Sequence, residues 1–219
     1  MSTSPALKRM TISIGARDVL LEVPADPDAL LEHSARTSDG DPYWGILWEA
    51  ASAMSACVLK LPWKPNQTAL ELGCGSGLVG IAAGLAGLTV CFSDYVPEAV
   101  ELAIRNAALN GMPAAEGLVL DWRQSCRRQF DIVLASDVLY ETGLHQPLLN
   151  LASQVMIPNG RWLIGDPGRP QARDFLNLAD DQGWKVTLFD RDLRPVVMPS
   201  RSQFQLLSLT RSPISSECC

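Results

Sequence analysis

The sequence predicts an α/β fold in which a mostly parallel sheet of seven strands carries helices on both faces. From residue 68 onward, short apolar segments alternate with helical patterns, which is typical of βαβ units. Early segments such as DIVLA (131–135) are apolar throughout rather than alternating, so we expect both faces of the sheet to be covered. The last two strand segments have no convincing helix between them, and a parallel crossover usually needs one. The last strand is therefore predicted to be antiparallel.

Ahead of this region, residues 1–42 predict an appendage made of a β-hairpin and a short helix. The segment MTISIGARDVLLEVP (10–24) alternates well enough for two strands, with GARD at the turn. A short helix and a loop follow it. We therefore divide the chain into this appendage, a main domain over 43–211 and a polar tail over 212–219 that ends in Cys218 and Cys219.

The main domain opens with a helix and then alternates strands and helices. The Ala-rich segment 46–61 has its apolar residues at helical spacing, and the Pro-rich segment 62–67 ends that helix. A later helix has Pro97 in its first turn and ends at Asn110, as helix termini favour. The predicted strands span 68–74, 89–95, 116–122, 130–137, 161–167, 184–190 and 203–211, and the helices between them span 77–87, 97–110, 143–156 and 171–182.

Composition narrows the function classes. The net charge of −6 argues against a nucleic-acid partner, because phosphate contacts need a basic surface. The sequence has no apolar run of the ~18 residues that a membrane span needs, and its start lacks the apolar core of a signal peptide. The cysteines form no C-x-x-C pair and His33 and His145 are isolated, so we expect no metal site. Cysteines within apolar segments are typical of a reducing compartment, and we expect a cytoplasmic protein.

The glycine-rich stretch TALELGCGSGLVGIAAGLAG (68–87) permits two interpretations. Gly75, Gly77 and Gly80 spell the G-x-G-x-x-G pattern of dinucleotide sites. Glu71, Gly73, Gly75 and Gly77 spell an E-x-G-x-G-x-G pattern, as in methyltransferases that use S-adenosylmethionine. A pyrophosphate favours the positive end of a helix, whereas S-adenosylmethionine has no phosphate and carries a positive sulfur. The carboxylate of Glu71 suits the cationic ligand better, so we favour S-adenosylmethionine.

Acidic and aromatic residues at the next strand ends complete the predicted cofactor site. Asp94 ends the second strand of the main domain and can accept both ribose hydroxyls, and Tyr95 follows it. Asp121 can accept from an adenine amine, and Trp122 can cover the face of the base. The alternative roles are a loop-capping carboxylate for Asp94 and a core position for Trp122.

Four segments carry a resemblance to a known family. They are PYWGILWEAASAM (42–54), LELGCGSGLVGIAA (70–83), FDIVLASDVLYE (130–141) and LIGDPGRPQ (163–171). Together they resemble the class I S-adenosylmethionine-dependent methyltransferases and, within them, the family 16 lysine methyltransferases. The last segment is very similar to the branch that methylates lysines of the electron-transfer flavoprotein β-subunit. The resemblance spans roughly residues 43–171.

The resemblance implies a Rossmann-like methyltransferase sheet, S-adenosyl-L-methionine as the cofactor and specific residue roles. Asp137 and Tyr140 are implied to face the substrate nitrogen, and Trp44, Asp166 and Arg169 are placed on the substrate side. The resemblance places Trp48, Gly73, Cys74, Gly75, Asp94, Trp122 and Ser136 at the cofactor, and with the residues argued above the predicted cofactor set also includes Glu71, Gly77, Tyr95 and Asp121.

The chemistry of methyl transfer to an amine assigns Asp137 an orienting role. A free lysine has a pKa of about 10.4, so its neutral form costs about 4.6 kcal/mol at pH 7. A nearby carboxylate raises that pKa, and Asp137 is therefore better suited to capturing and orienting the amine than to acting as a strong base. Tyr140 can form a wall of the channel or accept a hydrogen bond. The alternative roles are a cap of the following turn for Asp137 and simple core packing for Tyr140. Asp166 and Arg169 serve either as a rigid turn or as a substrate-side anchor, and both interpretations stay open.

Several functions are compatible with these features. The leading hypothesis is a protein-lysine N-methyltransferase, with the electron-transfer flavoprotein β-subunit as one candidate partner. The alternative is a methyltransferase of a small-molecule amine or hydroxyl. An open rim at Asp137 would favour a protein side chain, and a lid from residues 25–45 would favour a metabolite. A nicotinamide-dependent oxidoreductase and a non-catalytic binding module are further alternatives.

Overall fold

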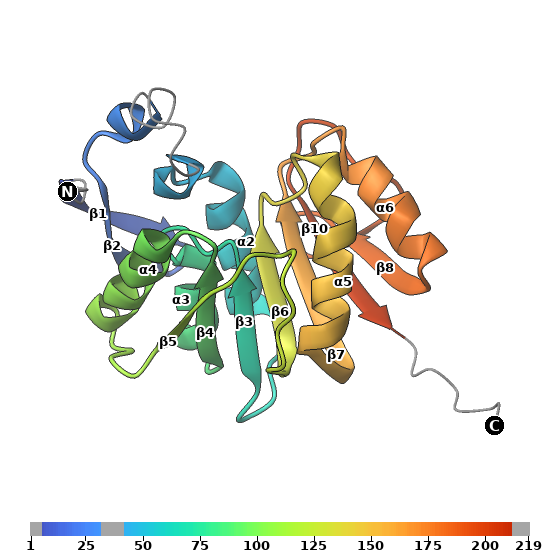
Figure 1. The fold of residues 1–219 in the computed structure, drawn as a ribbon, viewed down its shortest axis with the longest axis horizontal. Helices are drawn as coiled ribbons and strands as arrows, with labels where there is room; N and C mark the ends of the chain where they lie inside the picture. Colours follow the sequence, from blue (N-terminus) through green and yellow to red (C-terminus); the bar gives the residue numbers. More distant parts are fainter. Residues whose placement is uncertain (1–5, 32–41, 212–219) are drawn as a thin grey trace.

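The computed structural model describes residues 6–31 and 42–211, and its centre is an eight-stranded sheet (Figure 1). The strand order is β5-β4-β3-β6-β7-β10-β8-β9. The strands from β5 to β7 are parallel, whereas β10 runs antiparallel to both of its neighbours, β7 and β8. The predicted antiparallel last strand is thereby confirmed. The strands are β3 (Thr68–Leu72), β4 (Thr89–Asp94), β5 (Glu116–Val119), β6 (Phe130–Ser136), β7 (Met156–Asp166), β8 (Trp184–Phe189), β9 (Pro195–Val196) and β10 (Gln205–Arg211).

The prediction of seven strands was wrong by one. All seven predicted strands are present, and the eighth is β9, a two-residue strand at the edge of the sheet that pairs with β8. It lies in the segment between β8 and β10 that shows no helical pattern. Pro195 has no N–H to donate, which a strand at a sheet edge tolerates. Two residues are too few to show an alternating pattern, so the sequence did not reveal this strand.

Helices cover both faces of the sheet, as predicted. Because side chains alternate along a strand, Leu70 and Leu72 of β3 pack into one hydrophobic cluster and Ala69 into the other. The first cluster includes residues of α5 and α6, and the second includes residues of α2, α3 and α4. The helices are α2 (Glu49–Lys60), α3 (Leu78–Leu85), α4 (Pro97–Leu109), α5 (His145–Val155) and α6 (Ala172–Asp181), with short 3₁₀ helices η1 (Pro42–Gly45) and η2 (Thr142–Leu144).

The strand order creates a switch point in the middle of the sheet. The chain passes from β3 outward to β4 and β5, and then returns to β6 on the other side of β3. The loops after β3 and β6 therefore diverge at the carboxyl ends of adjacent strands. In open α/β sheets, ligands bind in the crevice that forms at such a point.

The N-terminal hairpin packs against the main domain. It consists of β1 (Leu7–Ile14) and β2 (Arg17–Pro24), and its buried apolar residues share one hydrophobic cluster with α2 and α3. The side chain of Asn106 on α4 accepts a hydrogen bond from the N–H of Glu22 and donates one to its carbonyl. Asn110 does the same for Leu20. The two asparagines thus hydrogen-bond the N–H and carbonyl groups of Leu20 and Glu22 on β2.

A short helix begins at residue 27, as predicted, but residues 32–41 and the tail 212–219 lie outside the described residues. Predictions for His33, Cys218 and Cys219 fall there, and so does the middle of the segment 25–45 that was considered as a lid. Across residues 6–31 and 42–211, no helix is long and apolar enough to cross a membrane.

Candidate active site

A cleft lies at the carboxyl ends of β3, β4 and β6 and is walled on one side by η1 and the start of α2. The space between its walls, part of it open to solvent, is about 770 Å³. Twelve predicted site residues line it: Trp44, Trp48, Glu71, Gly73, Cys74, Gly75, Asp94, Tyr95, Trp122, Ser136, Asp137 and Tyr140. Four others, Gly77, Asp121, Asp166 and Arg169, lie outside this lining.

The glycine loop after β3 has a backbone that only glycine adopts readily. Gly73, Gly75 and Gly77 have φ of +66°, +49° and +82°. A Cβ at Gly75 would lie 3.0 Å from the carbonyl oxygen of Trp44, so the loop also packs closely beneath η1. Gly80 is different, because it lies inside α3, where a Cβ would be 2.4 Å from Cε1 of Phe92. The three left-handed glycines are those of the E-x-G-x-G-x-G pattern.

Glu71 supports the loop from within. Its side chain is buried, and Oε2 accepts a hydrogen bond of 2.9 Å from the N–H of Gly80 in the first turn of α3. Burial, together with the nearby charge of Asp94, raises the pKa of Glu71 to about 8. Near neutral pH the group is therefore mostly protonated. Glu71 was predicted to be an anion that faces a cationic ligand, whereas its carboxyl group is hydrogen-bonded to the helix that follows the loop.

Asp94 ties the loop after β3 to the loop after β4. Its Oδ2 accepts from the N–H of Gly75 at 3.2 Å, and its Oδ1 accepts from the N–H of Val96 at 3.1 Å. The carboxylate is buried at the cleft wall, and Tyr95 beside it is half-exposed. A carboxylate fixed in this way at the end of the second parallel strand suits the hydroxyls of a ribose.

Trp122 and Ser136 line the cleft near the glycine loop, whereas the carboxylate of Asp121 is engaged elsewhere. A Cβ at Gly73 would lie 3.1 Å from Cζ2 of Trp122, so the indole packs directly on the loop. The buried hydroxyl of Ser136 has no hydrogen-bond partner among the described residues, and a bound polar ligand would supply one. Asp121 instead pairs with Arg123, whose hydrogen bonds lower the pKa of Asp121.

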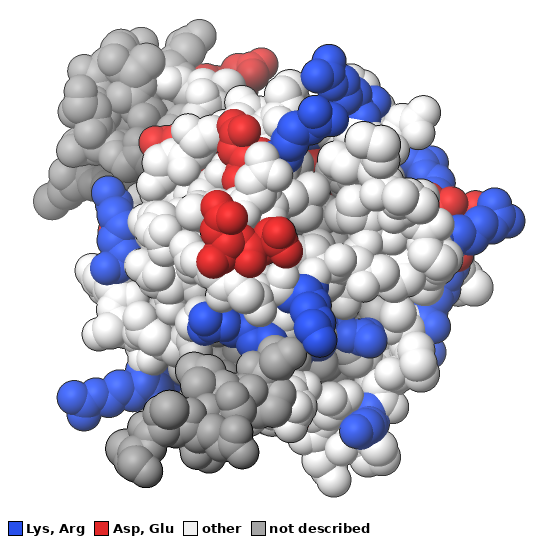
Figure 2. Space-filling model, turned by 90° about the vertical axis from the view of Figure 1, so that its right-hand side faces the viewer, with Lys and Arg blue, Asp and Glu red and all other residues white. Residues whose placement is uncertain are grey.

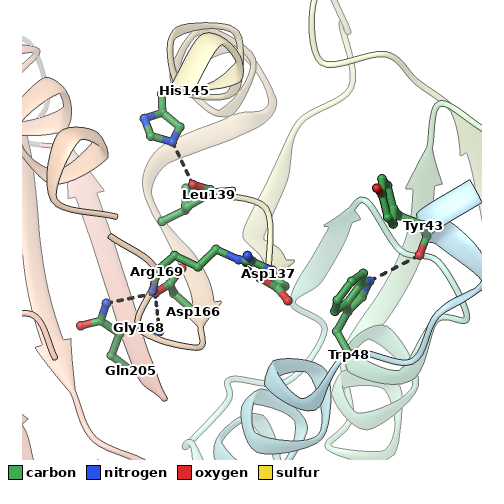
Figure 3. Close-up of polar contacts among 9 residues, drawn as sticks. All are labelled: Tyr43, Trp48, Asp137, Leu139, His145, Asp166, Gly168, Arg169 and Gln205. Atoms are coloured by element: carbon green, nitrogen blue, oxygen red, sulfur yellow. Dashed lines mark hydrogen bonds and ion pairs between the residues drawn. The ribbon is translucent and has the colours of Figure 1, made fainter. Parts of the chain in front are cut away.

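Aromatic side chains form the mouth of the cleft. Trp48 is the N-cap residue of α2, and its Nε1–H donates to the carbonyl of Tyr43 at 3.4 Å (Figure 3). Trp44, predicted on the substrate side, lies with its carbonyl against the glycine loop. Tyr43, Leu47 and the other apolar lining residues were not among the predicted site residues. The W-x-x-x-W segment that contains Leu47 was a signal for that wall of the cleft.

Asp137 and Tyr140 lie at the other end of the cleft, in the loop after β6. Asp137 is buried and has φ of +59°, which is uncommon outside glycine. Its Oδ1 pairs with Nε of Arg169 at 2.5 Å, and Figure 3 shows Asp137 between Arg169 and Trp48. The same loop is held by His145, whose Nε2 lies 3.2 Å from the carbonyl oxygen of Leu139.

Asp166 organises the turn that carries Arg169. It is fully buried, and its Oδ1 accepts from the N–H groups of Gly168 at 2.7 Å and Arg169 at 2.9 Å. Gln205 of β10 donates to the same oxygen at 3.1 Å. Burial raises the pKa of Asp166. Of the two interpretations left open, the rigid turn describes Asp166.

The cleft fits S-adenosylmethionine. The glycine loop permits close backbone approach, the carboxylate of Asp94 can accept from ribose hydroxyls, and the indole of Trp122 can cover a base. The buried hydroxyl of Ser136, which has no partner among the described residues, can bond to a polar ligand. This fold and this site are those of the class I S-adenosylmethionine-dependent methyltransferases. The ribosomal protein L11 methylase of Lactobacillus delbrueckii subsp. bulgaricus has the same fold, with a TM-score of 0.62 at 18% identity over 77% of this chain and 81% of that one.

Within this class, the chain belongs to the lysine methyltransferase family, whose model matches residues 33–182. It is similar to the electron transfer flavoprotein beta subunit lysine methyltransferase of Mus musculus, with 33% identity over 134 residues, 60% of this chain and 52% of that protein. It is also similar to a histidine protein methyltransferase 1 homolog of Dictyostelium discoideum, with 39% identity over 99 residues, 42% of this chain and 32% of that protein. The chain spans about half the length of the flavoprotein-methylating relative.

Proposed function

We propose that this chain is an S-adenosylmethionine-dependent protein-lysine N-methyltransferase. The observation that carries the proposal is that Asp137 lines the same cleft as the glycine loop. An amine held at its carboxylate would therefore lie beside the bound cofactor. Membership of the lysine methyltransferase family supports lysine as the acceptor.

In this proposal Asp137 and Tyr140 have separate roles in the transfer of the methyl group. When bound, S-adenosylmethionine supplies a methyl group on a positive sulfur, and the amine nitrogen forms its N–C bond as the C–S bond breaks, with one proton released to solvent. Asp137 accepts a hydrogen bond from the amine and aligns its lone pair, and Tyr140 forms the wall beside it. Alignment of this kind is the main contribution of an enzyme to such a displacement.

The mouth of the cleft supports a protein acceptor rather than a small molecule. Tyr43 is 50% exposed, and Trp48 and Tyr140 are each 37% exposed, so the described part of the rim is aromatic and partly exposed. A lysine side chain is long and apolar up to its amine, and aromatic rings attract its cationic end. An enzyme that encloses a metabolite would bury such rings.

The electron-transfer flavoprotein β-subunit is the acceptor that we propose to test first, because relatives of this chain carry its name. The experiment incubates the pure protein with methyl-labelled S-adenosylmethionine and recombinant β-subunit, and then identifies the labelled residue by mass spectrometry. We expect label on lysine, and none on a β-subunit whose labelled lysines are replaced by arginine. Label on histidine, as the name of the Dictyostelium relative suggests, or only on small molecules of a lysate, would reject the proposal.

We further propose a cytoplasmic protein with no nucleic-acid partner, and a division into 1–42, 43–211 and 212–219. On the face shown in Figure 2, basic side chains lie around a compact acidic cluster rather than in a basic stripe. Such mixed charge supports a protein partner more than a polyphosphate backbone. Gel-shift titration with RNA and DNA tests for a nucleic-acid partner, and fractionation of cells that express the tagged chain tests the compartment.

A further inference from the structure

Arg169 contacts both Asp137 and Tyr140, the two residues proposed to face the acceptor amine. Its Nε lies 2.5 Å from Oδ1 of Asp137, and the two side chains are 29% and 5% exposed (Figure 3). Its Cζ lies 5.8 Å from the centre of the Tyr140 ring. Arg169 is outside the residues that line the cleft, so it reaches the reaction through Asp137 and Tyr140.

The two partners of this ion pair are held by separate backbone contacts. The N–H of Asp137 donates to the carbonyl of Gly165 at 2.8 Å, which joins the loop after β6 to β7. Arg169 follows β7 on the turn that Asp166 organises. At Gly168 φ is +88°, and a Cβ would lie 2.6 Å from the N of Ser202, so the turn is packed tightly against the chain before β10. Both side chains are therefore presented from rigid positions.

The cation of Arg169 lies beside carboxyl groups of opposite charge. The titratable groups that face Arg169 are Asp137 from the β6 loop, Asp166 at the end of β7, and Tyr140. The pair with Asp137 raises the pKa of Arg169, which therefore remains a cation at every working pH. An unpaired carboxylate at Asp137 would raise the pKa of an approaching lysine ammonium and so disfavour its reactive form, whereas a fixed cation beside it has the opposite effect.

We infer that Arg169 is a positioning residue that holds the carboxylate of Asp137 in place and offsets its charge, so that the acceptor amine is bound in its neutral, nucleophilic form. One carboxylate oxygen is engaged by the guanidinium, and the other receives the amine N–H. The inference rests on the proposed function, because it concerns an amine at Asp137.

The test is the pH dependence of the methyl-transfer step in Arg169→Met and Arg169→Lys. The single-turnover rate is measured between pH 6.5 and 10, with enzyme and S-adenosylmethionine in excess over recombinant β-subunit, because this rate reports groups in the bound complex. Arg173→Met, on exposed surface of α6, is the matched control. Calorimetric titration with S-adenosylmethionine and thermal melts establish that each variant is folded and binds its cofactor.

For Arg169→Met we expect the midpoint of the profile to move up by about one pH unit, and the rate at pH 7 to fall about tenfold and recover as the pH rises. Arg169→Lys keeps the positive charge but lacks the planar set of N–H donors of the guanidinium, and it should move the midpoint of the pH profile less. Cofactor affinity should stay within about twofold, as in the control. An equal loss at every pH, or an unchanged profile, would overturn the inference while leaving the proposed function intact. A wild-type protein that methylates no lysine would overturn both.

Discussion

The two ends of the cleft are held together by different kinds of contact. At the cofactor end, the carboxyl groups of Glu71 and Asp94 accept hydrogen bonds from backbone N–H groups 9 and 19 residues away. At the acceptor end, Asp137 pairs with the side chain of Arg169, 32 residues away, and Asp166 with that of Gln205, 39 residues away. The first end uses side chain to backbone contacts within one βαβ unit. The second also has backbone contacts, at Asp166 and Asp137, and adds to them side chain pairs from separate elements.

This difference shows which end can change without loss of the other. A backbone N–H is present whatever the residue, so the cofactor end depends on a few glycines and carboxylates. A side chain pair needs both partners, so we expect substitutions at the proposed acceptor end to alter the reaction and to leave the glycine loop and Asp94 in place. The names of the two relatives give different acceptor residues, lysine and histidine.

The largest effect that separates the two ends is expected from Asp137→Ala. Because Asp137 is proposed to orient the amine and does not belong to the glycine loop, turnover should fall about 1,000-fold while S-adenosylmethionine affinity changes less than about twofold. Steady-state rates and calorimetry measure the two quantities, with Asp174→Ala on exposed surface of α6 as control. Turnover near the wild-type rate would show that the acceptor pocket lies elsewhere.

Asp94→Ala should have the converse effect at the cofactor end. The change removes the acceptor of two backbone N–H groups and the proposed ribose contact, so we expect S-adenosylmethionine to bind about 100-fold more weakly. The Asp137–Arg169 pair should remain. Calorimetry gives the affinity, and binding of unchanged strength would remove Asp94 from the cofactor site.

Glu71→Gln is a pH probe of the cofactor end. In the folded protein the pKa of Glu71 is about 8, raised from 4.5 by burial, so the folded state holds its proton where the unfolded state has lost it. This contribution to stability is present below pH 4.5 and is lost as the pH rises through 8. Between pH 5 and 7 the wild type should lose about 2 kcal/mol relative to Glu71→Gln, which does not titrate. Urea unfolding of both proteins measures the difference, and parallel curves would contradict the raised pKa.

The smallest effect is expected from Gln205→Leu at the acceptor end. The change removes one of three hydrogen bonds to Oδ1 of Asp166 and should cost about 1 kcal/mol of stability. The turn that carries Arg169 should loosen, with turnover reduced about fivefold and cofactor affinity unchanged. Kinetics and calorimetry on the same preparation test this, and weaker cofactor binding would show that the two ends are coupled.

Much of the architecture was predictable because it depends on short-range patterns. All seven predicted strands and the helices between them are present, and the antiparallel direction of β10 followed from the missing crossover helix. The edge strand β9 was missed because two residues show no periodicity. Most of the predicted site residues also line the cleft, because the carboxyl ends of parallel strands meet at one edge of the sheet.

The sequence by itself determined the fold class, the glycine loop and the set of strand ends that meet in the cleft, because alternation, glycine spacing and helix signals are local properties of the chain. Only the tertiary structure decided what the carboxyl groups do: Glu71 is buried and hydrogen-bonded to α3, Asp121 is paired with Arg123, and Asp137 is paired with Arg169. The reason is physical. The state of a carboxyl group depends on its burial and on its nearest donor, and both are set by elements that the chain brings together only on folding.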